Sequence, residues 1–174
     1  MIYAFESTAP RIHPSAYIAP EATIIGDVEI GPEVTVWPGA VIRGDVGSIR
    51  IGARTNIQDG AVVHVDTGGQ TVLEDDVTVG HLAMIHSCHI ESACLIGMSA
   101  TVLSRSRIGE GSIVGGGAVV LEGQEVPRFS VAAGVPAKVR KELDEETRSE
   151  RIAHAASYVE LGRRHREGLT QHEV

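Results

Sequence analysis

The sequence has little aromatic content, no long apolar run and no excess of basic charge. Only 3% of its 174 residues are Phe, Trp or Tyr, so its interior cannot depend on large rings. No apolar run approaches the ~20 residues that a membrane-spanning helix needs. The net charge of −8 and the pI of about 5.4 argue against nucleic acids and anionic membranes as partners.

Cysteine is also rare. Cys88 and Cys94 are the only two cysteines, too few for a disulfide framework, and no C-x-x-C motif indicates a zinc pair. We interpret both as reduced thiols. Residues 1–14 lack the basic and apolar segments of a signal peptide, so we expect a cytoplasmic protein.

An aliphatic residue recurs every sixth position through most of the chain. This period matches neither an amphipathic helix, with a repeat near 3.6, nor a plain strand, with a repeat of 2. It is typical of a β-solenoid, in which each hexad gives one short strand and one corner and three hexads close a triangular coil. The repeated residues are Ile12, Ile18, Ile24, Ile30, Val36, Ile42, Ile51, Ile57, Val63, Leu73, Val79, Ile85, Ile90, Ile96, Val102, Ile108, Val114, Val120 and Val126.

The repeat divides the chain into two parts. Residues 1–137 are predicted to form the all-β solenoid, with an irregular lead-in over residues 1–11. Residues 138–174 are predicted to form a C-terminal helix that packs along the outside of the solenoid. Asp144, Thr147 and Ser149 are the candidate N-caps, and residues 168–174 are expected to fray.

Three breaks interrupt the repeat in the middle of the chain. Three residues are inserted around residues 47–49, four are inserted around residues 66–70, and one is missing between Ile85 and Ile90. Insertions in solenoids are found at corners, often on the binding side. We therefore assume that the breaks change corner lengths without adding a side, which lets each hexad be assigned to a side by counting.

This count places His64 and His86 in one column, about 4.8 Å apart, with Arg43 one coil below. Two charged imidazoles this close would repel, whereas a metal binds neutral imidazole. His81 lies on another side and cannot easily reach the same ion from its own chain. A threefold assembly could bring it from a neighbour, giving three His ligands with one open position, as in catalytic zinc sites. The alternative to metal binding is an ordinary surface role for a histidine. We assign this role to the other five histidines: His13, His89, His154, His165 and His172.

Several motifs together resemble the γ-class carbonic anhydrase family over nearly the whole chain. They are Arg43-Gly44-Asp45, Asn56-Ile57-Gln58-Asp59, His64, Gly80-His81, His86, Ile96-Gly97-Met98 and Gly134-Val135-Pro136-Ala137-Lys138. The resemblance implies a left-handed parallel β-helix, a homotrimer, and metal sites at the subunit interfaces.

The resemblance also implies the reaction. His64, His81 and His86 match the ligands of Zn²⁺, with Fe²⁺ or Co²⁺ as alternatives. The metal lowers the pKa of bound water from about 15.7 to about 7, a value known from carbonic anhydrase itself, and the resulting hydroxide converts CO₂ reversibly to bicarbonate.

Five further residues match site positions of the family. Gln58 matches a residue that orients the metal-bound water. Arg43 and Asp59 match a salt bridge across the subunit interface, and Asp45 matches a partner in that network. Tyr158 matches a tyrosine near the site in some relatives.

The sequence departs from the best-known members at the proton-shuttle loop. Residues 65–70 carry one acid, Asp66, where those members have an acidic loop, and Val46 replaces another Glu. This resembles the loopless subclass and implies weaker turnover. Two other functions stay open: a hexapeptide acyltransferase, which generally uses a single His as base, and a non-catalytic metal-binding trimer.

Overall fold

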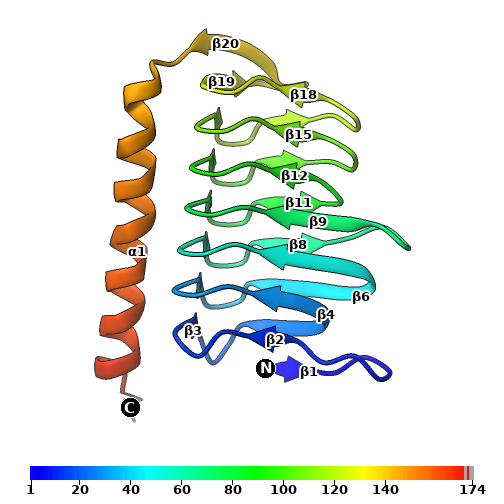
Figure 1. Cartoon of the computed structure of the whole chain (residues 1–174), viewed down its shortest axis with the longest axis vertical. Helices are drawn as coiled ribbons and strands as arrows, with labels where there is room; N and C mark the ends of the chain where they lie inside the picture. The colour runs from blue at the N-terminus through cyan, green and yellow to red at the C-terminus, as the bar shows by residue number, and fades with distance from the viewer. Residues whose placement is uncertain (171, 173–174) are drawn as a thin grey trace.

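The chain folds into a stack of triangular coils with one helix alongside (Figure 1). The structure is a computed structural model that describes residues 1–170 and residue 172. Strands on successive coils pair in parallel, directly above one another. The predicted fold class, an all-β left-handed parallel β-helix with a C-terminal helix, is confirmed.

Three flat sides, here called A, B and C, make up the solenoid. Side A contains β1 (Ile2–Tyr3), the first halves of β4 (Thr23–Ile30) and β6 (Val41–Ile51), β8 (Val62–His64), β11 (Met84–His86), β14 (Thr101–Val102) and β17 (Val119–Val120). Side B contains β2 (Arg11–Ile12), the second halves of β4 and β6, β9 (Gln70–Leu73), β12 (His89–Ile90), β15 (Arg107–Ile108) and β18 (Glu125–Val126). Side C contains β3 (Tyr17–Ile18), β5 (Thr35–Val36), β7 (Asn56–Ile57), β10 (Thr78–Val79), β13 (Leu95–Ile96), β16 (Ile113–Val114) and β19 (Ser130–Ala133).

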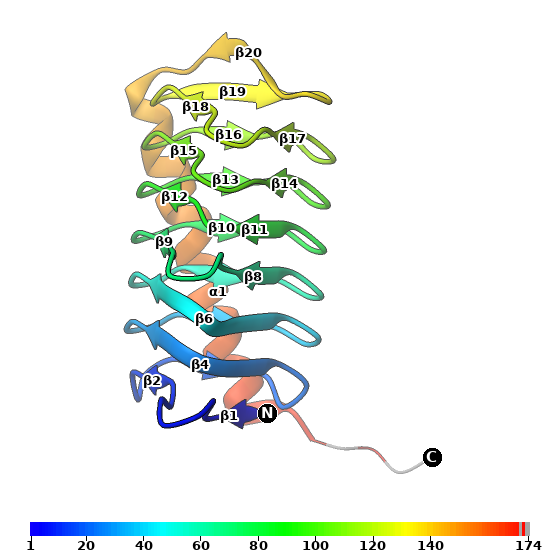
Figure 2. The same cartoon turned by 90° about the vertical axis from the view of Figure 1, so that its right-hand side faces the viewer.

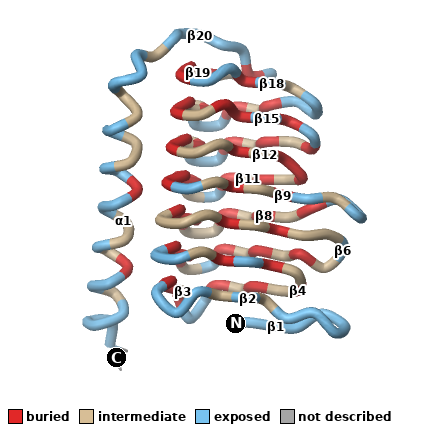
Figure 3. Tube along the Cα trace, viewed as in Figure 1, coloured by how far each residue is buried: buried red, intermediate tan, exposed pale blue. Residues whose placement is uncertain are grey.

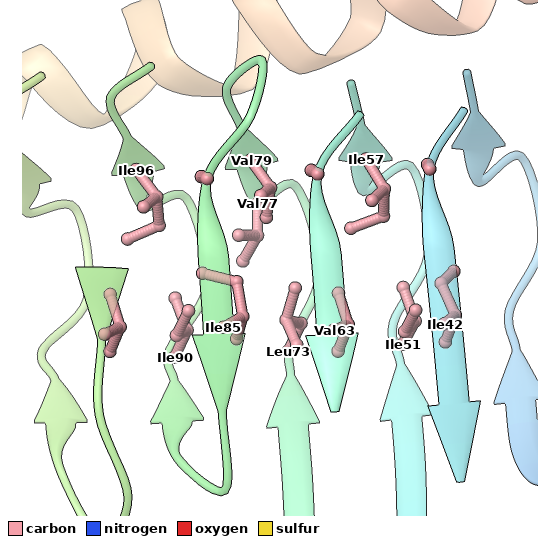
Figure 4. Packing of buried hydrophobic residues seen from close by; sticks show 14 of the residues in the cluster. Ile42, Ile51, Ile57, Val63, Leu73, Val77, Val79, Ile85, Ile90 and Ile96 are labelled. Atoms are coloured by element: carbon pink, nitrogen blue, oxygen red, sulfur yellow. The ribbon is translucent and has the colours of Figure 1, made fainter. Parts of the chain in front are cut away.

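Strand register confirms the assignment of hexads to sides across all three breaks. On side A, Ile42 pairs with Val63, and Val63 pairs with Ile85. On side B, Ile51 pairs with Leu73. Figure 4 shows these aliphatic side chains as columns inside the solenoid. The inserted residues therefore lengthen the corners and leave the columns intact.

The interior is filled by aliphatic side chains, and buried positions recur from coil to coil along the stack (Figure 3). The few aromatic residues lie elsewhere. Tyr17 and Trp37 lie on side C with their ring centroids 5.5 Å apart. Tyr158 from the helix packs edge-on against Trp37 at 5.7 Å. These three rings attach the helix to side C, where space is not limited by the coil spacing of about 4.8 Å.

The C-terminal segment starts with a strand before it becomes helical. Residues 138–142 form β20 (Lys138–Glu142), which pairs antiparallel with β19, and not the start of a helix. This strand covers the open edge of the last coil, whose backbone groups would otherwise lack partners. Asp144 then caps the short 3₁₀ helix η1 (Glu145–Thr147) by accepting a hydrogen bond from the Glu146 N–H.

Helix α1 (Arg148–Gly168) runs back down the stack against side C (Figures 1 and 2). Gly162 permits the close approach, because a Cβ there would lie 2.6 Å from Thr35 Cγ2. No helix in the described part of the chain is long and apolar enough to cross a bilayer. Positions 171, 173 and 174 of the predicted C-terminal segment lie outside the described residues.

Candidate metal centre

His64 and His86 end two adjacent strands of side A, β8 and β11. They are directly paired in the parallel register, so the predicted column is present. In each strand the preceding aliphatic residue points into the core, which turns the histidine outward. The ring centroids are 5.2 Å apart. His64 Nδ1 and His86 Nε2 face each other at 3.1 Å.

The outer nitrogen of His64 contacts a carboxylate. His64 Nε2 lies 3.2 Å from Asp45 Oδ1, and Arg43 donates to Asp45 Oδ2 at 2.5 Å. Burial raises the pKa of Asp45, but the hydrogen bonds from Arg43 and His64 outweigh it, so this pKa lies below its ordinary value. An ionised carboxylate can only accept, so the network assigns the proton to His64 Nε2. His64 Nδ1 then presents its lone pair to His86.

The spacing of the two facing nitrogens fits a bound metal. Two ligands about 2.0–2.1 Å from a tetrahedral Zn²⁺ would lie about 3.3 Å apart, close to the separation found here. His86 Nδ1, on the far side of its ring, lies 2.9 Å from Ser104 Oγ. Metal-ligating histidines usually have their other ring nitrogen held in this way. Imidazole ligands suit Zn²⁺, Fe²⁺ and Co²⁺ alike.

His81 lies apart from this pair, as predicted. It is in the turn before β11, whereas His86 ends that strand, and an extended chain spans about 3.3 Å per residue. Its Nδ1 is 2.9 Å from Asp59 Oδ2. Among the residues that the structure describes, no group of three or more His, Cys, Asp or Glu side chains could hold a metal ion. One chain therefore offers a facing pair of imidazoles and a separate third one.

Gln58 and Tyr158 meet near His81. Gln58 is buried at the end of β7, and its Nε2 donates to Asn56 Oδ1 at 3.0 Å. Burial and the charge of Asp59 raise the pKa of Tyr158, while a hydrogen bond with Gln58 lowers it; the pKa stays above its ordinary value. The structure thus brings three of the predicted site residues, Gln58, Asp59 and Tyr158, to the corner between sides C and A.

Within one chain, the charged residues do not form the salt bridge that the resemblance implies. Arg43 contacts Asp45, and Asp59 contacts His81. The predicted Arg43–Asp59 salt bridge would join two subunits, so it stays a prediction.

The remaining histidines make contacts away from this pair, as two of them illustrate. His89 lies on side B, where it bonds to Glu74 at 2.8 Å and to Arg107 at 3.2 Å. His165 packs against Trp37 with ring centroids 5.0 Å apart, so it helps to attach the helix. Sequence reasoning missed Ser104 because a serine at a solenoid corner looks like an ordinary turn residue. The sequence signal that could have identified Ser104 is its position one coil above His86.

Comparison with known proteins agrees with this architecture. The family model described as bacterial transferase hexapeptide (six repeats) matches residues 9–44 and 87–122. A carbonic anhydrase of Geobacillus kaustophilus is 42% identical over 162 residues, covering 93% of this chain and 89% of the relative. The carnitine operon protein CaiE of Proteus sp. is 37% identical, covering 98% of this chain and 86% of the relative. The mitochondrial gamma carbonic anhydrase 1 of Arabidopsis thaliana is 37% identical, covering 90% of this chain and 59% of the relative.

A solved structure from Bacillus cereus, provisionally described as an acetyltransferase, has 43% identity and a TM-score of 0.92, covering 96% of this chain and 97% of the other. The chain belongs to the γ-class carbonic anhydrase-like family of hexapeptide-repeat proteins, as its motifs predicted. The names of these relatives divide among carbonic anhydrase, CaiE and acetyltransferase. Family membership therefore leaves the activity to be argued from the site.

Proposed function

We propose that this protein is a metal-dependent carbonic anhydrase that hydrates CO₂ reversibly to bicarbonate at the interfaces of a homotrimer. The observation that carries the proposal is the pair of imidazole nitrogens facing each other at 3.1 Å. Asp45 holds the proton of His64 on the opposite side of its ring. A divalent cation, Zn²⁺ or alternatively Fe²⁺ or Co²⁺, is the chemical species that such a pair accepts.

When bound, the metal supplies hydroxide at neutral pH by lowering the pKa of water to about 7, the value known for carbonic anhydrase. The residues of the chain hold and orient the reactants. Asp45 and Arg43 fix the ring of His64. The Gln58 amide is fixed by Asn56 and contacts Tyr158, so it is suited to orient a water molecule or CO₂ beside the metal.

A second subunit completes the site in this proposal. His81 is too far from the facing pair in its own chain, so the third imidazole comes from a neighbour. Two exposed apolar side chains, Leu82 and Met98, lie at the corner of His81, 67% and 62% exposed. The outward residues of side A include Val62 and Met84, which are apolar and half-buried. Packing of this corner against side A of the next chain, repeated in a closed ring, would bury both apolar surfaces.

Metal content and CO₂ hydration test the proposal directly. Protein purified without chelator is expected to contain close to one divalent metal per chain, and stopped-flow assays should show hydration that a chelator removes. His86→Asn should remove both. His89→Asn is the matched control, because His89 lies on side B and should leave both unchanged. Hydration that is absent from the metal-loaded protein would contradict the enzymatic proposal.

Acyl transfer is the second candidate, favoured by the Bacillus cereus structure described as an acetyltransferase. That reaction would consume an acyl-CoA and needs one histidine as base, so it gives no reason for two facing imidazoles. Release of free CoA from acetyl-CoA with an amine or hydroxyl acceptor, by metal-free protein, would favour it. Stoichiometric metal binding with neither reaction would favour the non-catalytic trimer.

A further inference from the structure

The hydroxyl of Ser104 lies behind His86, on the side away from His64. Its Oγ is 2.9 Å from His86 Nδ1. Asp66 Oδ1 lies 3.8 Å from the same nitrogen, which is too far for a direct hydrogen bond. Ser104 is therefore the hydrogen-bond partner of His86, and it is only 7% exposed, so water does not readily replace it.

This contact determines which nitrogen of His86 faces His64. Because Ser104 holds Nδ1, the opposite nitrogen, Nε2, is the one that lies 3.1 Å from His64 Nδ1.

The two rings are thus held from opposite sides in the same manner. Asp45 contacts His64 Nε2, and Ser104 contacts His86 Nδ1. The two remaining nitrogens face each other at 3.1 Å, at the proposed metal position.

We propose that Ser104 is a positioning residue that fixes His86 with Nε2 directed at the metal position. This inference rests on the metal-dependent function proposed above. Loss of the Ser104 hydroxyl frees the ring to rotate, and metal affinity falls.

Ser104→Ala is the test, with Ser106→Ala as the matched control. Ser106 belongs to the same corner and is also buried, and its hydroxyl donates to the Leu103 carbonyl at 2.6 Å and not to a histidine. Zn²⁺ and Co²⁺ affinities are measured by competition with a chromophoric chelator on full-length trimer, and the visible spectrum of the Co²⁺ form reports ligand geometry. Ser104→Ala should weaken binding about 10–100-fold and shift the Co²⁺ bands. Ser104→Thr should restore most of the affinity.

Each result separates this inference from the function on which it rests. Wild-type affinity in Ser104→Ala, or an equal loss in Ser106→Ala, would overturn the positioning role while leaving metal-dependent function intact. A wild-type protein that binds neither Zn²⁺ nor Co²⁺ would overturn both. Metal binding without CO₂ hydration would overturn the enzymatic proposal alone, since the affinities of the serine variants still decide the role of Ser104.

Discussion

Mixed trimers of two inactive variants should regain metal, because each proposed site takes two ligands from one chain and one from the next. His64→Asn removes the facing pair from side A but keeps His81. His81→Asn keeps the facing pair but loses the third ligand. Each variant alone should therefore bind metal weakly, and neither change should prevent folding, since all three rings lie outside the core.

The amount regained follows from the symmetry. In a closed trimer, each interface joins side A of one chain to the His81 corner of the next. Any trimer with both variants has one interface at which a His81→Asn chain supplies the pair and a His64→Asn chain supplies His81. Mixed trimers should thus contain about one metal per trimer, or about one-third per chain, whatever their ratio of variants.

Coexpression with two different affinity tags, followed by tandem purification, isolates these mixed trimers. Metal analysis should then give about one-third of the wild-type content, and the CO₂ hydration rate should return to a similar fraction. Trimers of one variant carrying both tags are the control and should show no recovery. Mixed trimers that stay as empty as this control would refute the shared site, and so would a monomeric protein with full metal content.

Three further predictions concern the solenoid and its helix. Ile57→Ala, at a fully buried core position, should lower the free energy of unfolding by about 2–5 kcal/mol in urea titrations at fixed protein concentration; no loss would contradict the tight packing of the columns. Gly162→Ala should lower the melting temperature despite the better helix propensity of Ala, because the new Cβ would lie 2.6 Å from a side chain of side C. Gly168→Ala is the control and should not lower the melting temperature, because a Cβ there meets open space. Both cysteine thiols are buried, which raises their pKa values to about 12, so iodoacetamide at pH 8 should label them only after unfolding. Rapid labelling of the folded protein would refute that burial.

The sequence predicts most of the fold because closure of a triangular coil leaves little freedom. Each third hexad must return to the same side, so Ile42, Val63 and Ile85 stack even though insertions separate them. The strand that precedes the helix could not be read in this way. The Lys, Arg and Glu residues of 138–142 suit a helix as well as a strand, and the free edge of β19 decides between them.

Backbone register determines one part of the predicted arrangement. The column of His64 and His86 follows from counting, and so does the separation of His81. Side-chain partners are less predictable. The hydrogen bond between Arg43 and Asp45 depends on the rotamer of Arg43, which backbone register does not determine. Ser104 contacts His86 from the next coil and belongs to no sequence motif that would single it out.

The solenoid geometry explains why a site of this kind would be shared between chains. The coil spacing of about 4.8 Å brings equivalent residues of adjacent coils close enough for two ring nitrogens to meet, as His64 and His86 do at 3.1 Å. Further residues in the same column lie another coil away, and residues at the next corner are a full side distant. A third ligand from the same chain would therefore need a long loop, which this chain lacks. Under the proposed function, metal binding is therefore linked to assembly. Dilution that separates the subunits also removes one ligand from every site. Metal affinity should then depend on protein concentration.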